Sequence, residues 1–285
     1  MNGKKLHAAM MGVAVGDALG VPYEFRTKDT FTCTDMTGFG SHHQPKGTWS
    51  DDSSMTFAAL ESLRRLGKFD AEDMMRNFSL WRRCEAFTAR GEVFDIGECT
   101  RRAVDRFDSG APAARCGGTG ENENGNGSLM RILPLVFFPH TDEDVRVCSS
   151  LTHAHEISVN ACRIYLKIAE NLLSGMDKRD AVKVEADFSH PFDRMPMIAP
   201  LPRSEISGKG YAVSSLEASV WCLLNTDSYR DCVLAAVNLG DDTDTTAAIA
   251  GGLAGILYGI GGKKGIPEEW ISCLARREWI EELCK

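Results

Sequence analysis

The chain has 285 residues, of which 43% are hydrophobic and 25% charged; this is the balance of a soluble globular protein that buries a core without help from disulfides. Its formal net charge is -8, and its Lys and Arg residues are scattered along the chain, which argues against long nucleic acid as a partner. A small anionic ligand stays compatible with this charge, because a metal ion or a helix N-terminus can supply positive charge locally.

The cysteines and the first residues bear on the cellular compartment. Ten cysteines are present and none forms a CxxC pair, which predicts free, buried thiols in a reducing compartment. The N-terminus resembles a signal peptide in having lysines before an apolar stretch, but Asp17 and several glycines interrupt that stretch. Because no apolar run is long enough to span a bilayer, we expect a cytoplasmic protein with no membrane partner.

Helical periodicity dominates the first half of the chain. The spacing of apolar residues predicts helices over residues 4–19, 55–66, 71–83, 97–107 and 142–151. The apolar run Leu133–Phe138 is the one segment that could be read as a strand.

The second half follows the same pattern. Helices are expected over residues 157–173, 213–224, 228–238, 244–258 and 268–283. Residues 187–210 contain four prolines and little periodicity, which is typical of a long surface loop. No linker and no internal repeat divides the chain, so we predict one compact all-α domain over residues 1–285.

Two short acidic segments each place carboxylates and hydroxyls at the start of a predicted helix. They are Gly47–Met55, with Ser50, Asp51 and Asp52, and Gly240–Thr246, with Asp241, Asp242, Asp244 and Thr245. One such side chain would satisfy helix capping, and neighbouring carboxylates repel one another unless a positive charge lies between them. Oxygen ligands suit hard cations such as Mg²⁺, Mn²⁺ or Ca²⁺. The spacing alone leaves both capping and metal binding open.

The segment 117–128 is rich in glycine, which is typical of a flexible loop. Its backbone N–H groups could also approach a diphosphate. It is not a P-loop, because no G-K-[ST] sequence follows it. His153 and His155 stand two residues apart near a helix start, and two histidines alone do not make a zinc site.

These segments resemble the motifs of the ADP-ribosylglycohydrolase family, and they occur in the same order. The matching segments are Gly16–Glu24, Gly47–Met55, Phe94–Thr100, Gly125–Arg131, Leu151–His153, Gly208–Tyr211 with Ser215–Ala218, and Gly240–Gly252. Each motif alone is nonspecific, whereas seven in order across most of the chain are specific. Ser50 stands where threonine is often found, and Asp241 stands where glycine is frequent.

The resemblance implies an all-helical fold with a centre of two Mg²⁺ or Mn²⁺ ions in a cleft formed at helix starts. It implies hydrolysis of the glycosidic bond at the distal ribose of ADP-ribose. By this match the metal ligands would be Ser50, Asp51, Asp52, Asp242, Asp244 and Thr245. The catalytic carboxylates would be Glu24, as a gate or acid–base group, and Asp95. The substrate would contact Asn126, Gly127, Ser128, Met130, His153 and, as a platform for adenine, Tyr211.

Several of these residues also have plainer interpretations. Glu24 could be an ordinary surface glutamate, Asp95 could cap the helix that begins near Gly97, and Tyr211 could be a core aromatic residue. Trp49, beside the first acidic segment, is expected to pack rather than react.

Two other functions are compatible with the sequence. One is a non-catalytic relative that binds ADP-ribose or serves structurally, although such a protein would be expected to lack the acidic residues. The other is a metallophosphohydrolase, which would need Lys or Arg around the reacting phosphate; Arg131 lies near the glycine-rich segment. We expect the partner to be an ADP-ribosylated protein or a small ADP-ribosyl compound, with arginine favoured as acceptor, and the protein to be a monomer.

Overall fold

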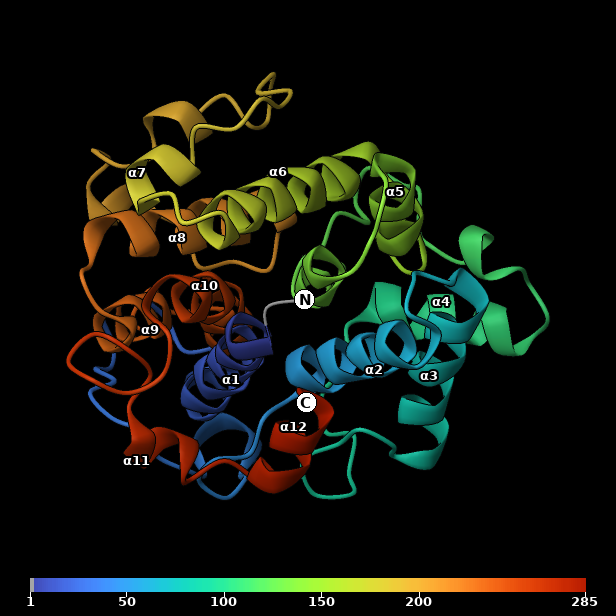
Figure 1. The fold of residues 1–285 in the computed structure, drawn as a ribbon, viewed down its shortest axis with the longest axis horizontal. Coiled ribbons are helices and arrows are strands. Elements are labelled where there is room, and N and C mark those ends of the chain that lie inside the picture. Colours follow the sequence, from blue (N-terminus) through green and yellow to red (C-terminus); the bar gives the residue numbers. More distant parts are fainter. Residues whose placement is uncertain (1–2) are drawn as a thin grey trace.

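The computed structural model describes residues 3–285, and helices make up most of it (Figure 1). Apolar residues at helical spacing form one buried core that reaches from the first helix to the last. The helices are α1 (Gly3–Gly20), α2 (Asp51–Leu66), α3 (Ala71–Cys84), α4 (Glu98–Asp108), α5 (Asp142–Ser150), α6 (Glu156–Leu173), α7 (Lys178–Ala181), α8 (Ala212–Asn225), α9 (Tyr229–Val237), α10 (Thr243–Tyr258), α11 (Glu268–Ile271) and α12 (Arg277–Leu283). The prediction of an all-α fold is confirmed.

Helices α1 and α10 lie at the centre and touch through their backbones. A Cβ atom on Gly12 would lie 2.2 Å from the carbonyl oxygen of Gly251, and one on Gly16 would lie 2.1 Å from that of Ala247. Only glycine allows such an approach, because any side chain would separate the two helices. The contact extends to the end of α1, where a Cβ atom on Gly20 would lie 2.3 Å from the Cα atom of Asp244. The second acidic motif is thereby placed against the end of α1.

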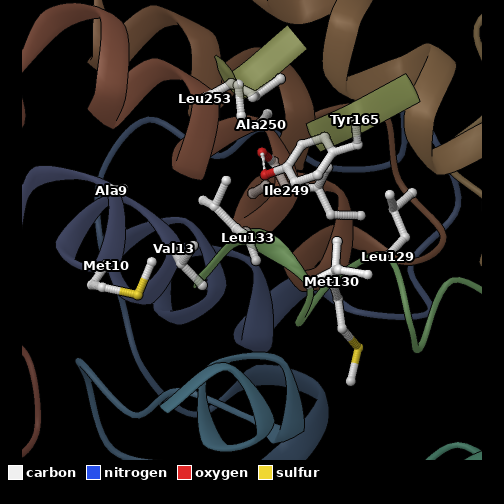
Figure 2. Packing of buried hydrophobic residues seen from close by; sticks show 14 of the residues in the cluster. Ala9, Met10, Val13, Leu129, Met130, Leu133, Tyr165, Ile249, Ala250 and Leu253 are labelled. Atoms are coloured by element: carbon white, nitrogen blue, oxygen red, sulfur yellow. Dashed lines mark hydrogen bonds between the residues drawn. The ribbon is translucent and has the colours of Figure 1, made fainter. Parts of the chain in front are cut away.

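The remaining helices surround this pair. Helices α8 and α9 pack against α10, and α6 packs against both α8 and α10 (Figure 1). Helix α2 packs against α1 and against α3. Figure 2 shows side chains from α1 and α10, such as Val13 and Leu253, meeting Leu133 and Tyr165 in the core. The Tyr165 hydroxyl donates a hydrogen bond to the carbonyl oxygen of Ile249 over 3.0 Å. This bond joins α6 to α10 and satisfies a buried polar group.

Three local predictions differ from the structure. Residues 268–283 do not form one helix, because the backbone between α11 and α12 pairs with the loop before α2. The Ala275 N–H group donates to the Gly47 carbonyl over 2.9 Å, and the Trp49 indole donates to the Ala275 carbonyl over 3.1 Å. Leu133–Phe137 forms a 3-10 helix and not a strand, and the short helix α7 was not predicted.

The expected surface loop at residues 187–210 contains two 3-10 turns and is partly packed. Phe192, Ile198 and Ile206 are buried, and the Trp221 indole on α8 donates to the Leu201 carbonyl over 2.9 Å. The loop therefore follows a fixed course over α8. Its last residues reach the start of α10.

The cysteines are free in the structure, as predicted, and seven of the ten are buried. Cys84 is exposed, and Cys99 and Cys273 are half-buried. Within residues 3–285, no helix combines the length and the hydropathy needed to cross a membrane.

We expect Gly16→Ala to destabilise the protein although alanine is the better helix former. The added methyl group would meet the Ala247 carbonyl at 2.1 Å, and overpacking against rigid backbone should cost about 3 kcal/mol or more. Gly3→Ala is the matched control, because a Cβ atom there meets nothing within 4 Å. Urea unfolding of both variants measures the difference. Equal stability of the two would contradict the close contact of α1 with α10.

Candidate active site

A cleft of about 500 Å³ opens where the starts of α2, α4 and α10 face the glycine-rich segment. Nine of the residues that the sequence singles out border it: Glu24, Asp51, Asp95, Asn126, Gly127, Met130, His153, Asp242 and Thr245. Ser50, Asp52 and Asp244 are buried and lie beneath them. Segments far apart in the sequence therefore meet at one cleft.

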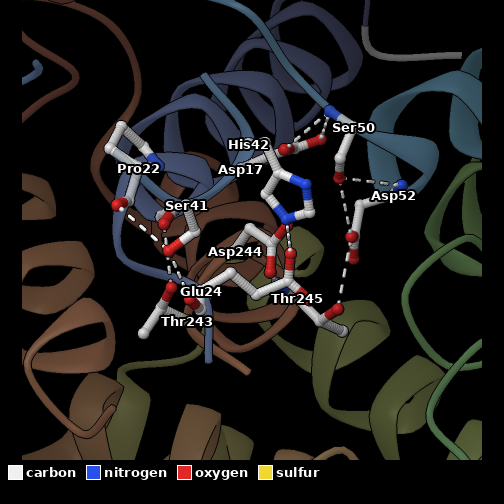
Figure 3. A network of polar contacts seen from close by, with 11 residues as sticks. Asp17, Pro22, Glu24, Ser41, His42, Ser50, Asp52, Thr243, Asp244 and Thr245 are labelled. Atoms are coloured by element: carbon white, nitrogen blue, oxygen red, sulfur yellow. Dashed lines mark hydrogen bonds and ion pairs between the residues drawn. The ribbon is translucent and has the colours of Figure 1, made fainter. Parts of the chain in front are cut away.

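The start of α2 is held by Asp17, which was not among the predicted site residues. Asp17 of α1 accepts hydrogen bonds from the Ser50 N–H group over 2.9 Å and from the Ser53 N–H group over 3.0 Å. Figure 3 shows the contact between Asp17 and Ser50. The Ser53 hydroxyl donates to the same carboxylate over 2.6 Å. An aspartate inside an otherwise apolar helix was the signal that could have identified it, because a buried charge needs a dedicated set of partners.

The two acidic motifs contact each other directly. The hydroxyl groups of Ser50 and Thr245 both donate to Oδ2 of Asp52, over 3.1 Å and 3.2 Å (Figure 3). Asp242 occupies the N-cap position of α10, yet its side chain makes no capping hydrogen bond. Its Oδ2 atom accepts instead from the Asn126 amide over 2.8 Å. Helix capping therefore does not account for Asp242.

Three carboxylate oxygens of the site are buried without a hydrogen-bond partner in residues 3–285. They are Oδ1 of Asp52, Oδ1 of Asp242 and Oδ2 of Asp244. Carboxylate oxygens of Asp17, Asp52 and Asp244 lie within 4.8 Å of one another, and so do those of Glu24, Asp95 and Asp244. A buried acceptor without a donor is costly, and a cation is the group that this oxygen-only set fits.

The proton affinity of these carboxylates points the same way. Burial, reinforced by Asp17 and Asp51, raises the pKa of Asp52 well above its usual range. Burial, reinforced by Glu24 and Asp52, does the same to the pKa of Asp244. Like charges in a dry site must be neutralised by protons or by cations. The cluster therefore has the charge and the ligand atoms to hold a metal ion.

Glu24 is not an ordinary surface residue, because only 5% of it is exposed. Its Oε2 atom pairs with Nε2 of His42 (Figure 3), whose ring lies between those of Phe25 and Phe94. Burial raises the pKa of Glu24 to about 7, against the opposing effect of the hydrogen bond from His42. That hydrogen bond in turn raises the pKa of His42.

The residues predicted to contact substrate fall into two groups. The Asn126 amide connects Asp242 with Ser215 of α8, and Gly127, Met130 and His153 border the cleft. Ser128 is fully buried, and its hydroxyl faces the Ser149 hydroxyl and the Cys162 thiol. The Ser128 side chain therefore points away from the cleft.

Tyr211 lies at the rim of the site and not in the core. It occupies the N-cap position of α8, and its backbone pairs with that of Gly125. Its side chain is exposed, while its neighbour Gly210 borders the cleft.

Comparison with known proteins agrees with this geometry. A model of the ADP-ribosylglycohydrolase family matches residues 3–285. The chain belongs to the ADP-ribosylglycohydrolase family. It is 32% identical over 289 residues to an ADP-ribosylarginine hydrolase of Pseudomonas putida (strain GB-1), covering 97% of this chain and 76% of that protein.

Other relatives extend the match. The chain is 31% identical over 289 residues to the ADP-ribosyl-[dinitrogen reductase] glycohydrolase of Rhodospirillum rubrum, covering 96% of this chain and 92% of that protein. A solved structure described as an ADP-ribosylglycohydrolase-related protein complex superposes with a TM-score of 0.82 at 31% identity, covering 99% of this chain and 96% of the other.

The backbone conformation of Asp241 is one that suits glycine, the residue that the family resemblance led us to expect at this position. Its φ angle is 59°, in the left-handed region that glycine adopts most easily and that Asp and Asn tolerate better than most residues. The Asp241 N–H group donates to the Arg26 carbonyl over 2.8 Å, and the Asp241 carbonyl accepts from the Phe25 N–H group over 2.6 Å. Asp241 therefore fixes the loop that carries Glu24 through its backbone.

We expect Mg²⁺ or Mn²⁺ to raise the melting temperature of chelator-treated protein, and by more at about pH 8 than at about pH 6. The pKa values of Asp52 and Asp244 are raised, and that of Asp17 is raised to about 6. Such groups lower the stability of the ion-free protein as the pH rises, because the folded state then loses protons that it binds more tightly than the unfolded state does. The ion should restore about 5 °C at high pH.

Thermal unfolding with each ion at both pH values measures this effect. The difference between samples with and without ion cancels groups that do not bind the ion, such as His153, whose lowered pKa acts in the opposite direction. Equal melting temperatures with and without ions at both pH values would contradict metal binding by this cluster.

Proposed function

We propose that this protein hydrolyses the N-glycosidic bond between ADP-ribose and the arginine side chain of a modified protein, and releases ADP-ribose. The observation that carries the proposal is the meeting of the two acidic motifs below one cleft. Asp52, Asp242 and Asp244 each keep a buried oxygen that the described protein groups leave unpaired. Membership of the family and the name of the Pseudomonas putida relative support ADP-ribosylarginine as the substrate.

Two Mg²⁺ or Mn²⁺ ions would be held by oxygen atoms from both motifs. Ser50, Asp51 and Asp52 would form one side of the centre, and Asp242, Asp244 and Thr245 the other. Asp17 is better suited to support than to coordination, because both of its oxygens already accept hydrogen bonds from α2. When bound, such ions supply a polarised water and a template for ribose hydroxyl groups.

The chain's own residues would manage the proton. Hydrolysis breaks the bond between the anomeric carbon and the guanidine nitrogen; water gives its hydroxyl group to the carbon and a proton to the nitrogen. Glu24 borders the cleft, and its pKa of about 7 lets it take up and release a proton near neutral pH. Asp95, half-buried on the same cleft, would contact the ribose or act as the general base.

The position of Arg131 argues against a phosphohydrolase. This residue is the cation that lies near the glycine-rich segment in the sequence, but its side chain is fully buried and its guanidinium group lies 4.7 Å from the ring centre of Phe78. It cannot contact a phosphate in the cleft. Arg102 borders the cleft and is already paired with Glu123 over 3.0 Å. A non-catalytic role is disfavoured because every acidic residue expected of the metal centre is present.

We expect the ion-loaded protein to release ADP-ribose, and not inorganic phosphate, from a peptide carrying ADP-ribosylarginine, and to do so faster than from a serine-linked peptide. Asp52→Asn and Asp242→Asn should each lower turnover about 100-fold or more, since an amide lacks the charge that holds a hard cation. Folding should persist, because asparagine has nearly the size and shape of aspartate and removes a buried charge. Turnover and bound-metal content measure both effects.

Asp241→Asn is the matched control, since Asp241 acts through its backbone and asparagine tolerates its φ angle. It should keep near-wild-type turnover. Near-wild-type turnover of Asp52→Asn and Asp242→Asn would show that hydrolysis does not depend on a metal centre held by these acids. Release of phosphate without ADP-ribose would replace the proposal with a phosphohydrolase.

We expect Tyr211→Ala to weaken ADP-ribose binding by about 1–3 kcal/mol, the range for a base stacked on an aromatic ring. Tyr211 is 36% exposed at the rim of the cleft, so its ring is available to a ligand. Tyr211→Phe keeps the ring and should bind as the wild type does. Calorimetry measures both affinities, and an unchanged affinity of Tyr211→Ala would remove the ring from the nucleotide site.

A further inference from the structure

Arg131 is a buried cation whose hydrogen-bonding partners are all neutral. One nitrogen, Nη2, donates to the Thr152 hydroxyl over 2.8 Å and to the Cys148 carbonyl over 3.2 Å. The face of Phe78 covers the guanidinium group. Arginine stays protonated in proteins, so Arg131 places a permanent positive charge near the glycine-rich segment. This arrangement needs an explanation, because burying an uncompensated charge is costly.

The next contact passes from Arg131 to the cleft. Oγ1 of Thr152 lies 2.8 Å from Nδ1 of His153. A guanidinium nitrogen can only donate, so the Thr152 oxygen accepts from Arg131 and its own hydrogen is free to be donated. Within residues 3–285, Nδ1 of His153 is the acceptor in contact with that hydroxyl. Nδ1 is therefore bare, and the ring hydrogen is on Nε2.

Nε2 of His153 lies on the side of the ring that faces Gly125 and Gly127 in the glycine-rich segment. His153 borders the cleft, and Cβ atoms placed on Gly125 or Gly127 would each lie 3.4 Å from Nε2. Because both residues are glycines, neither places a side chain of its own against Nε2, and His153 is among the residues that line the cleft. An oxygen atom of a ligand can therefore approach the Nε2–H group.

The ring also stays neutral over the physiological range. Burial, and after it the charge of Arg131, lowers the pKa of His153 to about 3. An isolated imidazole would interconvert between its two tautomers and gain a second proton in acid. The contact with Thr152 disfavours the exchange of tautomers. Burial and the charge of Arg131 disfavour the second proton.

We propose that Arg131 and Thr152 are positioning residues that fix His153 as a neutral hydrogen-bond donor, through Nε2, to an acceptor oxygen of the bound ADP-ribosyl group. The inference rests on the proposed function for the identity of the ligand. In the other tautomer Nε2 would present a lone pair to that oxygen and repel it. The chain Arg131–Thr152–His153 would thus select an oxygen-rich ligand without placing a charged side chain in the cleft.

The ring state can be measured without substrate. In ¹⁵N spectra of the histidine rings, assigned by the signal that His153→Gln removes, His153 should remain in the Nε2–H form from about pH 5.5 to about pH 8. A ring found in the Nδ1–H form, or one that gains a proton near its ordinary pKa, would overturn the proposal.

The role of Thr152 is tested by Thr152→Val, which keeps the shape and removes the hydroxyl. The ring of His153 should then show both tautomers, and the affinity for ADP-ribose should fall about tenfold. Thr152→Ser should restore the single tautomer and the affinity. Thr226→Val, which removes a hydroxyl that donates to the Cys222 carbonyl over 2.7 Å away from the cleft, should leave both unchanged.

The outcomes separate this inference from the proposed function. Wild-type affinity of Thr152→Val, or no binding of ADP-ribose by the wild type, would overturn the inference. Normal ADP-ribose binding with no hydrolysis of any ADP-ribosylated peptide would overturn the proposed function and leave the inference supported.

Discussion

The backbone contact between α1 and α10 is the constraint on which the rest of the site depends. Gly12, Gly16 and Gly20 lie along one face of α1 and bring α10 so close that no Cβ atom fits at these positions. The same approach brings Asp17 near the start of α10, where its carboxylate lies within 4.8 Å of those of Asp52 and Asp244. A wider separation of the two helices would break up the acidic cluster.

That proximity divides the acidic residues into two kinds. Asp17 is saturated with hydrogen bonds from the start of α2, so it satisfies amide groups that a helix leaves unpaired at its N-terminus. Asp52, Asp242 and Asp244 each keep an unpaired buried oxygen. One carboxylate thus supports the scaffold, and the unsatisfied carboxylates remain for ligands.

The sequence alone predicted the features that depend on a local pattern of residues. The period of apolar residues located the long helices to within a few residues, and the clustered acids at two helix starts indicated where the site lies. Interactions between distant segments were not visible. The break between α11 and α12 arises because Ala275 pairs with Gly47, and Asp17 gains its role from Ser50 and Ser53, more than thirty residues away.

The same limit applies to side-chain direction. Ser128 and Arg131 belong to a segment whose sequence suggested ligand contact, yet both side chains are buried away from the cleft. No local rule distinguishes them from Asn126, because the segment has no regular period over these residues. Their direction is set by what packs beneath the loop, namely Ser149 and Cys162 for Ser128 and Phe78 for Arg131.

The placement of charge follows from the ligand that the cleft is proposed to bind. ADP-ribose carries a negatively charged diphosphate. The carboxylates below the cleft would repel this diphosphate unless cations neutralised them. A positively charged side chain of the glycine-rich segment that faced the cleft could pair with those carboxylates and compete with the cations. A buried Arg131 avoids that competition, because its guanidinium group is enclosed by Phe78, Cys148 and Thr152. The charge of Arg131 still lowers the pKa of His153. Arg131 makes no direct contact with the cleft and acts there through the hydrogen bond between Thr152 and His153.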